Sequence, residues 1–164
     1  MKTSTVAGGA TNRSLAITLL LSGLLVGTLD IVAACVSYMI KTGGNPKVVL
    51  VYIASAVFGK EAFSGGDGMA AIGLLFHYLI AFGWTVLFFV IYPFVSTRIK
   101  NAWLLGVVYG LVVWSGMNLI VLPLTALTHS PITLNGALVA ATVLIVAIGI
   151  PLSFMARRYY KPAT

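Results

Sequence analysis

Four long apolar runs determine what this chain can fold into. They cover about residues 15–40, 69–95, 102–126 and 132–155, and the only charged side chain inside them is Asp30. A helix of about 20 apolar residues is long enough to cross the hydrocarbon core of a membrane, which is about 30 Å thick. The sequence therefore predicts four transmembrane helices.

Composition supports this class. Of the 164 residues, 60% are hydrophobic and 8% are charged, whereas a soluble domain has about 25% charged residues. So little charge cannot cover a surface that faces water. We expect an all-α polytopic protein with a single membrane domain, residues 15–156, between a flexible cytoplasmic tail, 1–14, and a basic cytoplasmic tail, 157–164.

The connection between the first two runs contains a shorter apolar segment. Residues 48–58 are too few to span a membrane. Asn45 and Pro46 suit the N-cap and the first position of a helix, and Asp67 suits the cap of the next span. We expect an additional short interfacial or re-entrant helix, about 46–58, that packs over the outer ends of the four-helix bundle and acts as a lid or collar.

Basic residues are divided unequally between the two ends of such a bundle. One side holds Lys2, Arg13, Arg98, Lys100, Arg157, Arg158 and Lys161, and the other holds Lys41, Lys47 and Lys60. The side richer in Lys and Arg normally faces the cytoplasm, so both termini are expected there. The net charge of +7 suits membrane lipids as partners. No basic patch with interleaved aromatic residues indicates nucleic acid.

Asp30 is a candidate site residue because an acid inside a membrane span is expensive to bury. At 1.5 Å per residue it lies about 15 Å before the outer end of its helix, and His77 and Asn118 lie about 12 Å from the outer ends of theirs. Trp84 shares a helix face with His77, and Ser115 adds a hydroxyl nearby. We expect Asp30 and His77 to form a coupled pair, with Asn118 beside them, at a proton, ion or substrate site.

Two roles are open for these polar residues. An acid and an imidazole can relay protons or bind a cation, which predicts a small transporter or a proton-coupled channel. Alternatively, they only hydrogen-bond to one another and fix the bundle. One His, one Asp and one Asn form a thin ligand set, so neither a metal nor another cofactor is expected. No nucleophile or phosphate-binding motif indicates an enzyme.

Two GxxxG pairs are candidate helix-packing sites. They are Gly23 with Gly27 in the first run, and Gly106 with Gly110 in the third. Small residues at this spacing let helices approach closely. They also support a second function, a non-catalytic membrane subunit or assembly scaffold that binds other helices. Four helices enclose little room, so a homo-oligomer or other membrane subunits are expected as partners.

Residues 73–131 carry a family resemblance. The stretch contains HYLIAFGW at 77–84, Tyr92-Pro93, WLLGVVYG at 103–110 and LPLTALT at 122–128. It resembles small four-span bacterial inner-membrane proteins of a domain-of-unknown-function family, with a histidine in the same span and a proline–leucine step in the next. The resemblance implies a bacterial inner membrane as the location and implies nothing about mechanism.

The chain has a single cysteine, Cys35, so an intrachain disulfide is excluded. Val32-Ala33-Ala34-Cys35 looks like a lipoprotein processing box. Asp30 would then lie inside the apolar part of a signal peptide, and the apolar run continues past the cysteine. Lipidation of Cys35 therefore stays open.

Overall fold

The computed structural model describes residues 14–125 and 133–160, and every regular element within these ranges is a helix. In chain order the elements are α1 Leu15–Thr42, α2 Lys47–Phe58, the 3-10 helix η1 Gly59–Ser64, α3 Gly66–Arg98, α4 Ala102–Gly116, the π-helix η2 Met117–Val121, the 3-10 helix η3 Leu122–Leu124, α5 Leu134–Leu144, the π-helix η4 Ile145–Gly149 and α6 Ile150–Tyr160.

Four of the helical segments described are long and apolar enough to cross a membrane, which confirms the predicted architecture. They are Leu15–Thr42, Gly66–Arg98, Ala102–Leu124 and Leu134–Tyr160. The last span differs most from its predicted range, because helix α6 continues through Arg157 and Arg158 instead of ending before them. These two basic residues thus occupy the final turn of a helix, where cations interact favourably with its dipole.

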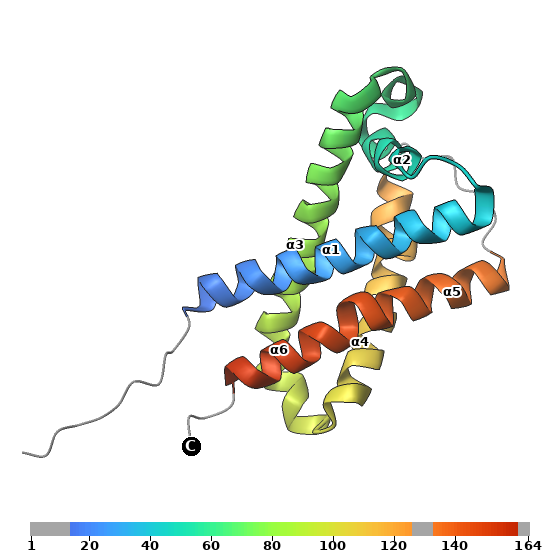
Figure 1. Ribbon diagram of the computed structural model, residues 1–164. Coiled ribbons are helices and arrows are strands. Elements are labelled where there is room, and N and C mark those ends of the chain that lie inside the picture. The colour runs from blue at the N-terminus through green and yellow to red at the C-terminus, as the bar shows by residue number, and fades with distance from the viewer. Residues whose placement is uncertain (1–13, 126–132, 161–164) are drawn as a thin grey trace, which may run out of the picture.

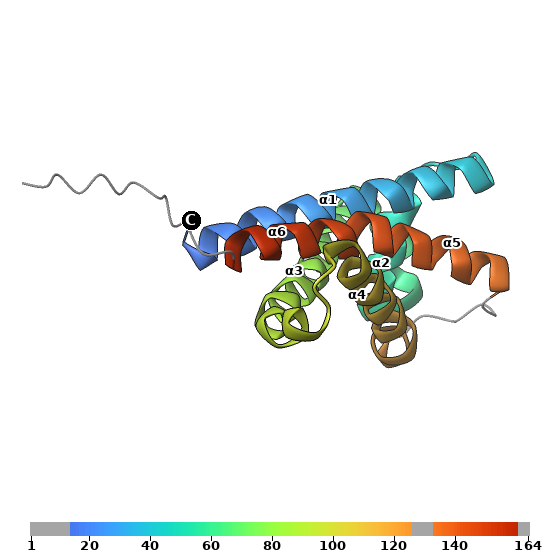
Figure 2. The ribbon, with the colours of Figure 1, turned by 90° about the horizontal axis from the view of Figure 1, so that it is seen from below.

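The spans form two layers that cross. Helix α1 runs antiparallel beside the α5–α6 segment, and α3 and α4 lie together on one side of that pair (Figures 1 and 2). One end of the molecule contains the beginning of α1, the end of α6 and the loop that joins α3 to α4 (Figure 1). Helix α2 lies at the other end, beside the first half of α3.

The main core lies where the two layers meet. Its most deeply buried large side chains are Val26, Phe88, Phe89, Val113 and Leu152. Hydroxyl groups that enter this region donate to backbone carbonyls of other helices: Tyr109 to Trp84 O at 2.5 Å, and Ser153 to Ala102 O at 2.7 Å. Burying a hydroxyl without an acceptor would be unfavourable. These bonds remove that cost, and they also link neighbouring helices.

Helix α4 packs against η4 and α6 backbone to backbone. A Cβ added to Gly149 would lie 2.1 Å from Gly106 O and 2.8 Å from Gly110 N. A Cβ on Gly106 would lie 2.7 Å from Ile150 Cα. Only hydrogen atoms fit between these segments, so the second GxxxG pair and Gly149 together allow a close helix crossing.

Each π-helix ends two residues before a proline. η2 ends at Val121, before Pro123, and η4 ends at Gly149, before Pro151. Proline has no N–H, so the carbonyl four residues earlier loses its α-helical donor. A single wide turn just before the proline accommodates that loss.

Pro93 lies inside α3 and is accommodated in a different way. The helix continues through it, and the Phe89 carbonyl that Pro93 cannot reach accepts a hydrogen bond from the Tyr160 hydroxyl, 3.0 Å away. The Tyr160 ring stacks on Tyr92, with 5.3 Å between ring centroids. The last turn of α6 thus supplies the missing donor to α3.

Tyr160→Phe is expected to lower the free energy of unfolding by about 1 kcal/mol, because the ring contact stays while the Phe89 carbonyl loses its donor. Tyr159→Phe is the matched control, since Tyr159 contacts Phe89 through its ring and its hydroxyl has no hydrogen bond among the described residues. Unfolding midpoints in mild detergent measure both. Equal midpoints for the two variants would contradict the role given to this bond.

Helix α2 is the expected short helix, and it packs tightly against α3. A Cβ added to Gly73 of α3 would lie 1.9 Å from Leu50 O and 3.2 Å from Ala54 N of α2. Val51 and Ala54 are buried in this contact. With 12 residues the helix is about 18 Å long, too short to cross a membrane. It is held along the first half of α3, at the end of the molecule opposite the start of α1 and the end of α6.

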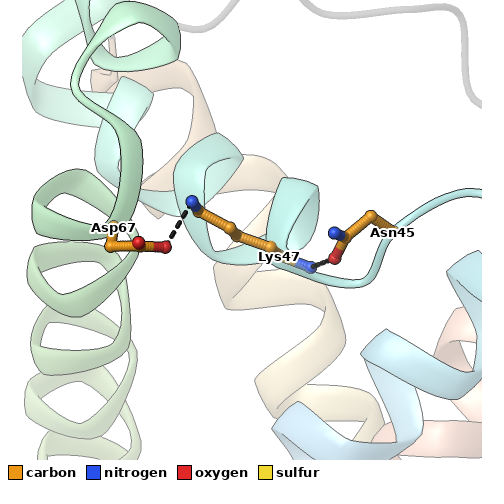
Figure 3. Close-up of polar contacts among 3 residues, drawn as sticks. All are labelled: Asn45, Lys47 and Asp67. Atoms are coloured by element: carbon orange, nitrogen blue, oxygen red, sulfur yellow. Dashed lines mark hydrogen bonds and ion pairs between the residues drawn. The ribbon is translucent and has the colours of Figure 1, made fainter.

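The starts of α2 and α3 each differ from the prediction in one detail. Asn45 Oδ1 accepts from the Lys47 amide at 2.9 Å, but the helix begins at Lys47, with Pro46 in the capping position. Asp67 does not cap α3; its carboxylate pairs with the Lys47 amino group instead (Figure 3). The nearby lysine offers the carboxylate a stronger partner than the amides of its own helix, so Asp67 connects α2 with α3.

Candidate functional site

The first GxxxG pair receives aromatic rings from α3. A Cβ on Gly23 would lie 2.3 Å from two carbons of the Phe82 ring, and a Cβ on Gly27 would lie 2.9 Å from the Tyr78 ring. The two glycines therefore form notches on α1 that large side chains fill. This arrangement brings the middle of α3, including the residue before Tyr78, against the backbone of α1.

That residue is His77, and it bonds directly to α1. Its Nε2 atom lies 2.8 Å from Gly27 O. A carbonyl oxygen only accepts, so Nε2 carries the hydrogen and donates. Next to it, the Tyr78 hydroxyl and Thr28 Oγ1 form a second bond between the two helices, at 2.8 Å. Both contacts are made at consecutive residues of each helix.

Asp30 lies one helical turn beyond Gly27 on α1, at neighbouring positions of one helix face. It is half-buried, and its carboxyl group interacts electrostatically with His77. No hydrogen bond or ion pair joins the Asp30 side chain to any residue that the structure describes. The structure thus places the acid one turn from the carbonyl that His77 binds, and it leaves the acid without a hydrogen bond or ion pair among the described residues.

Asn118 belongs to a different contact. Its amide Nδ2 donates to Trp114 O of its own helix at 2.8 Å. Ser115, one residue further on, is half-buried. Neither side chain hydrogen-bonds to Asp30 or His77, both of which lie in the described part of the chain. The Asn118 amide reaches a carbonyl one turn back on its own helix more easily than it reaches a side chain on another helix. The predicted depth of Asn118 does not indicate which of these partners it binds.

Trp84 connects α3 to the end of α4 and the start of η2. Its indole Nε1 donates to Met117 Sδ at 3.4 Å, and its ring lies against Gly116, where a Cβ would come within 2.3 Å. It lies seven residues beyond His77, about 10 Å along the helix. Trp84 therefore holds α3 and α4 together at a distance from the acid.

The described residues contain no cluster of three or more His, Cys, Asp or Glu side chains that could hold a metal ion. Cys35 is half-buried, and its Sγ lies 3.9 Å from Pro46 O. His129, the second histidine of the sequence, lies outside the described residues. The candidate site is therefore the pair Asp30 and His77, on helices α1 and α3.

Sequence reasoning missed the carbonyl of Gly27 and the Thr28–Tyr78 hydroxyl pair. The residue order offered one indication: small or polar residues adjoin at Gly27-Thr28 on α1 and at His77-Tyr78 on α3. Which residues face each other across two helices depends on their rotation, which only the packed structure supplies.

No protein family model, curated protein or solved structure matches this chain.

Proposed function

We propose that this protein is a proton-coupled transporter or channel of a bacterial inner membrane, with Asp30 and His77 as the groups that exchange protons. One observation carries the proposal: an acid in an apolar helix lies one turn from the carbonyl that an imidazole of another helix binds, and it has no hydrogen-bond partner among the described residues. Ionisable residues at such depths are expensive, and they mark proton and ion pathways in membrane proteins.

The histidine is held in a way that suits proton exchange. Because Nε2 donates to Gly27 O, the nitrogen that gains or loses a proton is Nδ1. The ring can change its charge while one hydrogen bond keeps its position. Tyr78 is the other titratable side chain at this contact, and its hydroxyl is already paired with Thr28. The opposing segments α5 and η4 contain no titratable residue.

A purely structural role for Asp30 has less support. Several hydrogen bonds already join the spans, and the acid takes part in none of them: His77 to Gly27 O, Tyr78 with Thr28, Tyr109 to Trp84 O, Ser153 to Ala102 O and Tyr160 to Phe89 O. A carboxylate is also more expensive to bury than a neutral amide. Asp30→Asn is therefore expected to keep the fold, with equal or higher thermal stability.

Proton flux in liposomes tests the proposal. With a pH-sensitive dye inside and an imposed potential, the wild-type protein is expected to give a flux that depends on pH, and Asp30→Asn is expected to reduce it to the level of protein-free liposomes. His77→Gln is expected to do the same, because its amide can still donate to Gly27 O but cannot titrate.

Glu61→Gln is the matched control, since it removes an exposed acid at the end of the molecule and should leave the flux unchanged. Folding of each variant is checked by its melting temperature and elution volume. Wild-type flux that survives Asp30→Asn in a folded protein would reject the role of this pair. A wild-type protein without flux would reject the proposal as a whole.

The alternative role, an assembly subunit that binds partners through its glycine faces, is weakened by the contacts within the chain. Gly23 and Gly27 are covered by α3, and Gly106 and Gly110 by η4 and α6. A partner helix would have to displace these segments before it could use either face.

A further inference from the structure

The end of the molecule that carries both the start of α1 and the end of α6 has cations and no acidic side chain. The described cations there are Arg98, Lys100, Arg157 and Arg158, all exposed. The three acids of the sequence lie elsewhere: Asp30 in the middle of α1, and Glu61 and Asp67 beside α2 at the opposite end. Among the described residues the one ion pair is that of Lys47 with Asp67, so no described side chain neutralises the cations at this end.

An open groove lies at the same end, along the last two turns of α3. Its volume is about 560 Å³, and its lining residues are Pro93, Phe94, Val95, Thr97, Arg98 and Ile99. The lining is mostly apolar, with Arg98 as its one charged residue and Phe94 75% exposed. The groove thus offers a cation beside an apolar wall.

We propose that this groove binds one anionic phospholipid, with the phosphate on Arg98 and Lys100 and the first part of an acyl chain against Phe94 and Ile99. Arginine binds phosphate through two parallel hydrogen bonds. Trp103, two residues into α4 and 61% exposed, suits the level of lipid headgroups. The inference is independent of the proton-coupled function.

The charge of the headgroup decides between lipids. A phosphatidylglycerol headgroup carries a net negative charge, whereas phosphatidylcholine brings its own cation close to Arg98 and Lys100 and loses most of the attraction. A free phosphate would use the two cations and leave Phe94 and Ile99 uncovered. Only an anionic lipid satisfies both halves of the groove.

Native mass spectrometry of the purified protein in neutral detergent micelles tests this site. The protein is titrated with dioleoyl phosphatidylglycerol or dioleoyl phosphatidylcholine, and the first bound lipid is followed. The wild-type protein is expected to bind phosphatidylglycerol on the order of tenfold more tightly, and the double variant Arg98→Gln with Lys100→Gln is expected to lose that preference. Arg98→Lys, which keeps the charge, should retain most of it.

The double variant Lys41→Gln with Lys60→Gln is the matched control, because it removes two exposed cations from the opposite end. It should bind phosphatidylglycerol as the wild type does. Equal losses in the two double variants would show a general effect of net charge and overturn the proposal. The same holds if the wild type does not distinguish the two lipids, or if glycerol phosphate alone competes as well as the lipid does.

Discussion

Replacement of Gly73 by alanine is expected to release α2 from α3. The added methyl group would lie 1.9 Å from Leu50 O, far inside van der Waals contact, and the obstructing atom belongs to a helix backbone that cannot rotate away. Overpacking of this kind destabilises a well-packed contact by about 1–3 kcal/mol. We expect the upper end of that range, because α2 must move as a whole and Val51 and Ala54 lose their buried positions.

Hydrogen exchange measures this effect locally. The amides of α2, Lys47–Phe58, should lose much of their protection in Gly73→Ala, while those of α4 and α6 keep theirs. Gly83→Ala is a close control: it lies on the same helix, and a Cβ there meets no atom within 4 Å. The control should be neutral or slightly stabilising, as alanine is the better helix former. Unchanged protection of α2 in Gly73→Ala would contradict the tight docking.

Gly149→Ala is expected to destabilise the whole protein. Its methyl group would lie 2.1 Å from Gly106 O and 2.8 Å from Gly110 N, so it would force α4 away from η4. The core side chains Tyr109, Val113 and Leu152 pack around this crossing and would lose contacts together. We expect a loss of about 3 kcal/mol or more in the free energy of unfolding, among the larger effects of a single substitution.

Unfolding in mixed micelles of increasing sodium dodecyl sulfate fraction measures this loss, with Gly83→Ala again as the control for a new methyl group in a span. The Trp84 indole, which donates to Met117 Sδ and lies against Gly116, gives a second readout, since its emission should shift once α4 moves. A Gly149→Ala protein as stable as the wild type would show that the crossing has room that these distances exclude.

The sequence by itself determined the number and the approximate limits of the spans. Length and the near absence of charge decide this, because a helix of about 20 mostly apolar residues can span the hydrocarbon core of a membrane. Counting residues also predicted that Asp30 and His77 lie at a similar depth, because the rise per residue of a helix is constant, and this depth stays a prediction. Their position on neighbouring helices was a hypothesis, which the structure supports by bringing His77 onto Gly27 O.

The tertiary structure decided how each helix is rotated and what it contacts. The two GxxxG pairs look alike in sequence, yet one receives the rings of Tyr78 and Phe82 and the other receives the backbone at Gly149. Asn118 has a suitable depth but bonds to its own helix. The place of α2 depends on Gly73, a residue of another helix. Residue counts along one helix give depth, whereas these contacts depend on the rotation and crossing of two helices, which packing sets for the whole chain at once.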